Sequence, residues 1–205
     1  MPVLTRSAAK QLKDVTPAAE HALALRESVT QKAQAVWTAR GDIDVYTGSN
    51  REATETPQVD HVLEVQLAEM SLVRAYKAER AGSDSIATLQ ATEMMRDALN
   101  SVSNLNVTST RVNQSKRGPV TAALNRLNNE RLRTVPLEQL ARQGKASWLV
   151  DEGIWARIER EIVVSYDTLD EELRGGGVDA LPAAAALVNG SFDELATMLS
   201  SLKLI

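Results

Sequence analysis

The chain has 205 residues and a formal net charge of −4, with 43% hydrophobic and 24% charged residues. This composition is ordinary for a globular protein of one domain and argues against a uniformly basic nucleic-acid-binding coat. The absence of cysteine excludes disulfide bonds and cysteine-based zinc or redox sites. Because the first residues resemble no signal peptide and no apolar run approaches about 20 residues, we expect an intracellular protein, cytoplasmic or nuclear, with no membrane partner.

The first 60 residues change character near Gly41. Apolar residues recur at intervals of three and four and predict a helix over residues 17–39. Residues 42–58 lose that period and contain turn signals such as Pro57. We therefore expect a helical segment over residues 1–40, followed by an irregular or β element.

Two further helices and a polar segment follow His61. The helical period predicts one helix from about residue 63 to Gly82 and another over residues 84–100. The segment SNLNVTSTRVNQSKRG then begins at Ser103 and carries three asparagines, which favour neither helix nor strand. Its NLNVT alternation predicts a short strand, and Thr108 or Ser109 can cap a helix that Gly118-Pro119 would end.

The C-terminal region, residues 121–205, is predicted to be helical and packed into the same domain. An apolar stripe from Ile154 to Leu173 is its strongest helical signal, and Trp148 and Trp155 beside its start are interpreted as core anchors, with base stacking as the alternative. Ser191, followed three residues later by a glutamate, predicts a capping box at the start of a last helix. The expected fold class is mostly α (α+β), with a small β element between residues 42 and 108.

The adjacent pair Asp60-His61 is the first candidate for chemistry. It follows a turn and precedes a helix, where a short strand can present both side chains. A carboxylate can bind a hard divalent cation while a neighbouring imidazole takes a proton from water. The chain's other histidine, His21, lies beside Glu20 in a predicted amphipathic helix and is interpreted as a surface residue.

Together with Asn104 and Asn113-x-x-Lys116, the Asp60-His61 pair resembles the HNH, or His-Me finger, nucleases. The spacing of the last three residues is similar to that in the HNH domain of CRISPR effector nucleases, and the sequence DVYTGS at residues 44–49 resembles the strand and turn that open the motif. This resemblance implies a ββα-metal unit, a β-hairpin and a helix around one metal ion, embedded here in a helical domain. The unit would cover residues 41–120, with a two-helix insertion at about 62–100.

The resemblance also implies a role for each residue. Asp60 and Asn113 would bind the metal, His61 would be the general base, and Asn104 would hold the loop and orient His61. Oxygen ligands suit Mg²⁺ or Mn²⁺ better than Zn²⁺. Glu64, one helical turn after His61, is a secondary candidate for the metal site.

A basic cluster follows the motif. Between residues 111 and 133 there are six basic residues and one acidic residue. A cluster of this kind can bind phosphate even when the whole chain is acidic. We therefore expect Lys116, Arg117 and Arg111 to contact nucleic-acid phosphates, with DNA favoured over RNA. Two alternatives remain: a non-catalytic helical interaction protein, and an HNH-like protein that binds nucleic acid without cleaving it.

Overall fold

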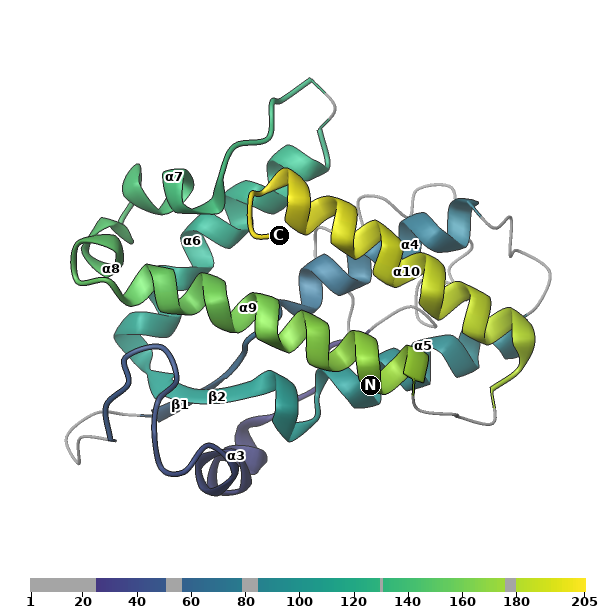
Figure 1. The fold of residues 1–205 in the computed structure, drawn as a ribbon, viewed down its shortest axis with the longest axis horizontal. Coiled ribbons are helices and arrows are strands. Elements are labelled where there is room, and N and C mark those ends of the chain that lie inside the picture. Colours follow the sequence, from purple (N-terminus) through teal and green to yellow (C-terminus); the bar gives the residue numbers. More distant parts are fainter. Residues whose placement is uncertain (1–24, 51–56, 79–84, 130, 176–179) are drawn as a thin grey trace.

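The computed structural model of the chain describes residues 25–50, 57–78, 85–129, 131–175 and 180–205 (Figure 1). In chain order the elements are a 3₁₀ turn (Thr30–Lys32), α3 (Ala33–Ala39), β1 (Pro57–His61), α4 (Val65–Ala78), α5 (Ser85–Leu99), a 3₁₀ turn (Val102–Asn104), β2 (Leu105–Ser109), α6 (Thr110–Leu127), α7 (Leu137–Arg142), α8 (Ser147–Asp151), α9 (Ile154–Asp170), a π-helical turn (Glu171–Gly175) and α10 (Pro182–Ser201). The fold class is mostly α with a small β element, as the sequence predicts. No helix in the described ranges is both long and apolar enough to span a membrane.

The two strands form one antiparallel hairpin although 43 positions separate His61 from Asn104. The register pairs Asp60 with Asn106 and His61 with Leu105. Helices α4 and α5 fill the gap, and α6 follows β2 directly (Figure 1). The two ends of the long insertion therefore lie side by side, as the two ends of a short hairpin loop do.

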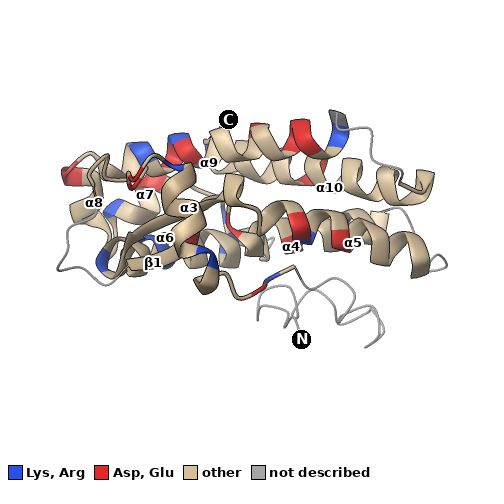
Figure 2. Cartoon of the chain, turned by 90° about the horizontal axis from the view of Figure 1, so that it is seen from below, with Lys and Arg blue, Asp and Glu red and all other residues tan. Residues whose placement is uncertain are grey.

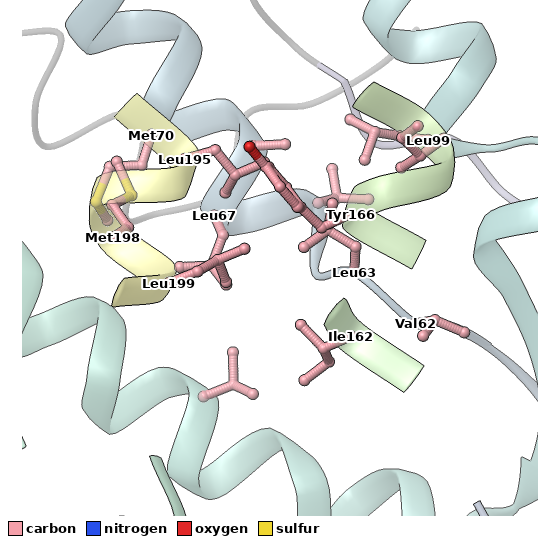
Figure 3. Packing of buried hydrophobic residues seen from close by; sticks show 14 of the residues in the cluster. Val62, Leu63, Leu67, Met70, Leu99, Ile162, Tyr166, Leu195, Met198 and Leu199 are labelled. Carbon is pink, nitrogen blue, oxygen red and sulfur yellow. The ribbon is translucent and has the colours of Figure 1, made fainter. Parts of the chain in front are cut away.

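The core is built mainly by α4, α5, α9 and α10. The most extensive contact between two elements is that of α10 with α4. Figure 3 shows the apolar side chains that meet there, including Leu67 and Met70 from α4, Tyr166 from α9, and Leu195 and Met198 from α10. Val62 and Leu63, which follow β1 directly, enter the same cluster and are also labelled in Figure 3. The end of β1 is therefore anchored in the helical core.

The N-terminal helix is shorter than predicted. Residues 25–29 are not helical, α3 begins only at Ala33, and residues 17–24, with His21, lie outside the described residues. The reason is that the backbone of Leu25 makes tertiary hydrogen bonds: its N–H donates to Glu69 Oε1, and its carbonyl accepts from Asn100 Nδ2. An extended segment can make such bonds and a helix cannot, so tertiary contacts override the helical period.

Helix α6 continues to Leu127, so the prediction that Gly118-Pro119 ends it is wrong. Ser109 caps its start as expected, with its Oγ accepting from Val112 N. Pro119 removes one N–H donor, but it is buried with the apolar face of the helix. Burial of that face outweighs the lost hydrogen bond.

The predicted capping box at Ser191 is also wrong. Helix α10 begins at Pro182, a favourable first helical residue, and Ser191 lies in its middle. Its buried hydroxyl is 3.0 Å from Ser71 Oγ of α4. The helix begins nine residues before Ser191, so the serine and the glutamate have the spacing of a capping box without lying at a helix start.

Candidate active site

A pocket of about 300 Å³ lies at the outer edge of β1. Five of the eight predicted site residues line it: Asp60, His61, Glu64, Asn113 and Arg117. They come from β1, the start of the insertion and α6. The other three, Asn104, Lys116 and Arg111, do not line this pocket.

His61 is held in one orientation inside this pocket. Its Nε2 is 2.9 Å from Asn100 Oδ1, and the amide nitrogen of Asn100 donates to the carbonyls of Leu25 and Arg96. Because the amide oxygen only accepts, Nε2 carries the hydrogen and the lone pair is on Nδ1. No described residue bonds to Nδ1.

Burial keeps His61 uncharged. The ring is 4% exposed, and this desolvation lowers the pKa of His61 to about 4, against the opposing effect of the Asn100 hydrogen bond. The positive charge of Arg26 lowers the pKa further. At neutral pH the imidazole is therefore neutral, which is the form that can accept a proton.

Lys116 is buried between two carboxylates, away from the surface. Its Nζ lies 2.6 Å from Asp60 Oδ2 and 3.0 Å from Glu64 Oε1, and it donates to the backbone carbonyl of His61. The hydroxyl of Tyr46 donates to the same Asp60 oxygen. The side chain of Lys116 is 0% exposed, so in this arrangement it fixes Asp60 and the end of β1 and does not reach a phosphate in solution.

Burial and the neighbouring charges shift the pKa values of the groups in this cluster. Burial by itself lowers the pKa of Lys116, but the carboxylates of Asp60 and Glu64 raise it well above its usual range. Burial raises the pKa of Glu64, and the charge of Lys116 opposes that rise. Burial and the Asp60 carboxylate raise the pKa of Tyr46 well above its usual range. Lys116 is therefore a permanent cation, and Tyr46 a permanent donor, beside Asp60.

Asn104 holds the loop after β1. Its Oδ1 accepts from Leu63 N and from Ser165 Oγ of α9, and its Nδ2 donates to the carbonyls of Leu63 and Leu99. These bonds tie the chain after β1 to the end of α5 and to α9. The direct partner of His61 is Asn100, however, so Asn104 acts on His61 only through the backbone.

Two side-chain oxygens of the residues that line the pocket are candidate metal ligands. Asp60 uses Oδ2 for Lys116 and Tyr46, and Asn113 uses Nδ2 to donate to Gln58 Oε1. The Oδ1 atoms of Asp60 and Asn113 accept no hydrogen bond from the described residues. Both are hard oxygen donors, so the residues fit a Mg²⁺-like ion.

No group of three or more Asp, Glu or His side chains within the described ranges is arranged to hold a metal. A cation at Asp60 and Asn113 would have two protein ligands, with water and phosphate oxygens completing its shell. Mg²⁺ is commonly held in this way, through one or two carboxylates and the substrate. The charge of Lys116 beside Asp60 predicts weak binding of the metal alone.

The predicted basic cluster does not form one surface. Figure 2 shows basic segments along α6 and near β1. Arg117 is exposed at the pocket edge, where Arg26 joins it. Arg111 instead stacks on Trp148, 3.8 Å from the ring centre, and Arg126 donates to the carbonyl of Arg133 far along the helix. Only part of the cluster can therefore act at this pocket.

The turn that precedes the motif is bonded to β2. The buried carboxylate of Asp44 accepts from Asn106 Nδ2 and Thr108 Oγ1, both at 2.8 Å. Gly48 has a φ of +72°, in the left-handed region that favours glycine, and the Arg157 guanidinium lies close to it. Asn106 consequently supports the turn that carries Tyr46.

Sequence reasoning did not identify Asn100, Tyr46 or Arg26. Asn100 ends the second predicted helix and resembles an ordinary helix-terminal asparagine. Tyr46 stands inside the DVYTGS segment, which was the only available signal. Arg26 has no motif around it, because only the extended path of its segment brings it to the pocket. No protein-family model, curated protein or solved structure matches this chain.

Proposed function

We propose that this chain is a metal-dependent endonuclease of the HNH type that hydrolyses phosphodiester bonds of DNA, with RNA as the alternative substrate. The observation that carries the proposal is that Asp60, His61 and Asn113 line one pocket. They reach it from a strand and a helix separated by a two-helix insertion. Five predicted residues in one place are unexpected for a helical interaction protein with no site.

Each residue of the site has a separate role in the proposed reaction. Nδ1 of neutral His61 accepts the proton of the attacking water, while Asn100 holds the ring from its other nitrogen. Asp60 and Asn113 would hold the divalent ion, which when bound neutralises charge at the phosphate and the leaving oxygen. Arg117 and Arg26 supply positive charge at the rim for flanking phosphates.

The test is cleavage of supercoiled plasmid by the purified chain with Mg²⁺ or Mn²⁺ and with chelator. We expect nicking or linearisation with metal only, and a loss of about 10²-fold or more in His61→Ala. The matched control is His21→Ala, which removes the chain's other histidine and should leave the rate unchanged. Unchanged cleavage by folded His61→Ala would refute the catalytic assignment.

The metal ligands have a separate readout. Asp60→Asn and Asn113→Ala should raise the Mn²⁺ concentration needed for half-maximal cleavage, measured by titrating the metal at fixed DNA. The Arg117→Ala variant should weaken DNA binding and leave that concentration unchanged. An equal metal requirement in all variants would contradict the ligand assignment.

A second candidate function is nucleic-acid binding without turnover. The observation that favours it is the 2.6 Å contact between Lys116 Nζ and Asp60 Oδ2, because the ammonium already neutralises the only carboxylate among the two proposed ligands. In that case DNA should bind equally well with or without metal, and no cleavage should occur with Mg²⁺, Mn²⁺, Co²⁺ or Ni²⁺.

A further inference from the structure

A second pocket, of about 210 Å³, lies at the other end of the hairpin, where β1 begins and β2 ends. Its walls include Trp37 of α3, Trp148 of α8 and Arg111 from the first turn of α6. The proposed nuclease mechanism uses neither tryptophan, and Arg111, which the sequence predicts to contact phosphates, lines this pocket and not the candidate active site. Two partly exposed tryptophans in one pocket are notable in a chain with only 3% aromatic residues.

The flat groups of this pocket are fixed by their neighbours. The Arg111 guanidinium lies 3.8 Å from the centre of the Trp148 ring, and Trp148 Nε1 donates to Ser115 Oγ at 3.0 Å. Trp37 packs against the small apolar cluster that contains Val107 of β2. Planes of this kind, aromatic or guanidinium, are the surfaces on which proteins stack unpaired bases.

The polar lining matches the edge of a base better than a phosphate. Ser49, Asn50 and Glu152 line the pocket, and their side chains have no hydrogen-bond partner among the described residues. A hydroxyl, an amide and a carboxylate can donate to and accept from base edges. The carboxylates of Glu152 and Asp44 would repel a phosphate inside the pocket. The volume of the pocket is below the roughly 300 Å³ at which drug-sized sites begin, so it suits a small ligand such as a single base.

Helix α6 contributes to both pockets. Arg111 lines this pocket and Arg117 lines the candidate active site, six residues apart. That spacing is about 9 Å along the helix axis and roughly 120° around it, so the two arginines lie on different sides of α6. Neither arginine has a carboxylate partner within the described part of the chain, so both can contact nucleic-acid phosphates.

We propose that the Trp37–Trp148 pocket binds one unpaired nucleobase of a nucleic-acid strand. The base stacks on the Arg111–Trp148 pair or on Trp37, and its edge contacts Asn50, Ser49 or Glu152. The proposal rests on the proposed function for the choice of a nucleic acid as the ligand. It adds a preference for single-stranded or locally opened substrate.

The experiment measures binding of a labelled single-stranded DNA oligonucleotide by fluorescence anisotropy, in chelator so that no cleavage occurs. We expect Trp148→Ala to bind about 10-fold more weakly and Trp148→Phe to retain most of the affinity, because phenylalanine keeps a stacking face. Both variants lose the Ser115 hydrogen bond, so their difference isolates the ring. Asn50 is exposed, so an Asn50→Ala variant leaves the core intact, and its weaker binding of the oligonucleotide tests the pocket without a change in folding.

An oligonucleotide that is abasic at every position keeps the phosphates and removes all of the bases. We expect it to bind wild-type protein more weakly and to bind Trp148→Ala and wild type equally. Equal binding of both oligonucleotides by wild type, or equal affinity of Trp148→Ala and wild type for the base-bearing strand, overturns the proposal. Saturable binding of free peptides at the same tryptophans, with no effect of DNA, overturns it in favour of a protein ligand.

The result is independent of catalysis. Cleavage of plasmid without tryptophan-dependent binding leaves the proposed nuclease standing and refutes the base pocket. Tryptophan-dependent binding without cleavage in any metal supports the base pocket and refutes the nuclease.

Discussion

The contact between α4 and α10 and the β1–β2–α6 unit are stabilised by different kinds of buried groups. The buried side chains of α4 and α10 are mainly leucine, alanine, valine and methionine; the polar ones are Ser71, Ser191 and Glu69, whose carboxylate accepts from Leu25 N. In the hairpin-and-helix unit and the segments that contact it, the buried groups include Asp60, His61 and Lys116. Burying ionisable groups is costly unless each is paired. The stability of the polar unit therefore depends on keeping each buried charge paired, and that of the helical pair depends mainly on apolar packing.

The largest effect is expected from breaking the buried ion cluster. Lys116→Met leaves the carboxylates of Asp60 and Glu64 buried without a cation. We expect the free energy of unfolding to fall by about 4 kcal/mol, measured by urea unfolding at pH 7. Lys116→Met/Glu64→Gln should recover part of the loss, because it removes one uncompensated charge. A loss below about 1 kcal/mol in the single variant would show that the cluster is not coupled to folding.

A cavity made between α4 and α10 should lower the stability of the protein without changing its cleavage activity. Leu195 of α10 is fully buried in the core that Figure 3 shows. Leu195→Ala should cost about 3 kcal/mol of unfolding free energy, from lost burial and the cavity left behind. Plasmid cleavage per folded molecule should not change. A fall in that specific activity would mean that the two regions are not separable.

Stability should also depend on pH through His61. Its folded pKa is about 4 against 6.5 when unfolded, so between these values the unfolded chain binds a proton that the native chain does not. The contribution is complete above pH 6.5 and is lost as the pH falls toward 4. We expect about 1.5 kcal/mol less stability at pH 5 than at pH 6.5 from this group.

The matched variant for the pH measurement is His61→Gln, which can still donate to Asn100 but does not titrate. Urea unfolding of both proteins at pH 5.0, 5.8 and 6.5 gives the difference between them and cancels the carboxylates that titrate in both. Parallel pH dependences for the two proteins would contradict the lowered pKa.

The smallest effect is expected at the hydroxyl pair of the helical core. Ser71 Oγ donates to the Ala68 carbonyl, so Ser191 supplies the hydrogen bond between the two hydroxyls. Ser71→Ala should cost about 1 kcal/mol because it leaves the Ser191 hydroxyl buried without that partner, while Ser71→Ala/Ser191→Ala should cost no more. Thermal unfolding of the four proteins of this double-mutant cycle tests the pair. Additive losses would show that the hydroxyls do not interact.

Much of the site's framework was predictable because it depends on neighbours in sequence. Alternation at Leu105 and Val107 indicated β2, and Ser109 was a good candidate cap for α6. The two inserted helices followed from their apolar period. The errors occurred where a local signal competed with packing, as at Pro119, whose missing donor was outweighed by burial of its helix face.

The chemical groups of this protein and the order of strand, insertion, strand and helix can be read from the amino-acid sequence, because hydrophobic period and turn chemistry are local properties. Which of these groups meet depends on how the elements pack. The side chain of Lys116 is buried because it pairs with Asp60 of β1 and with Glu64, three residues after that strand. Asn100 reaches His61 because the end of the insertion returns beside β1. Such contacts join residues tens of positions apart, and no local propensity encodes them.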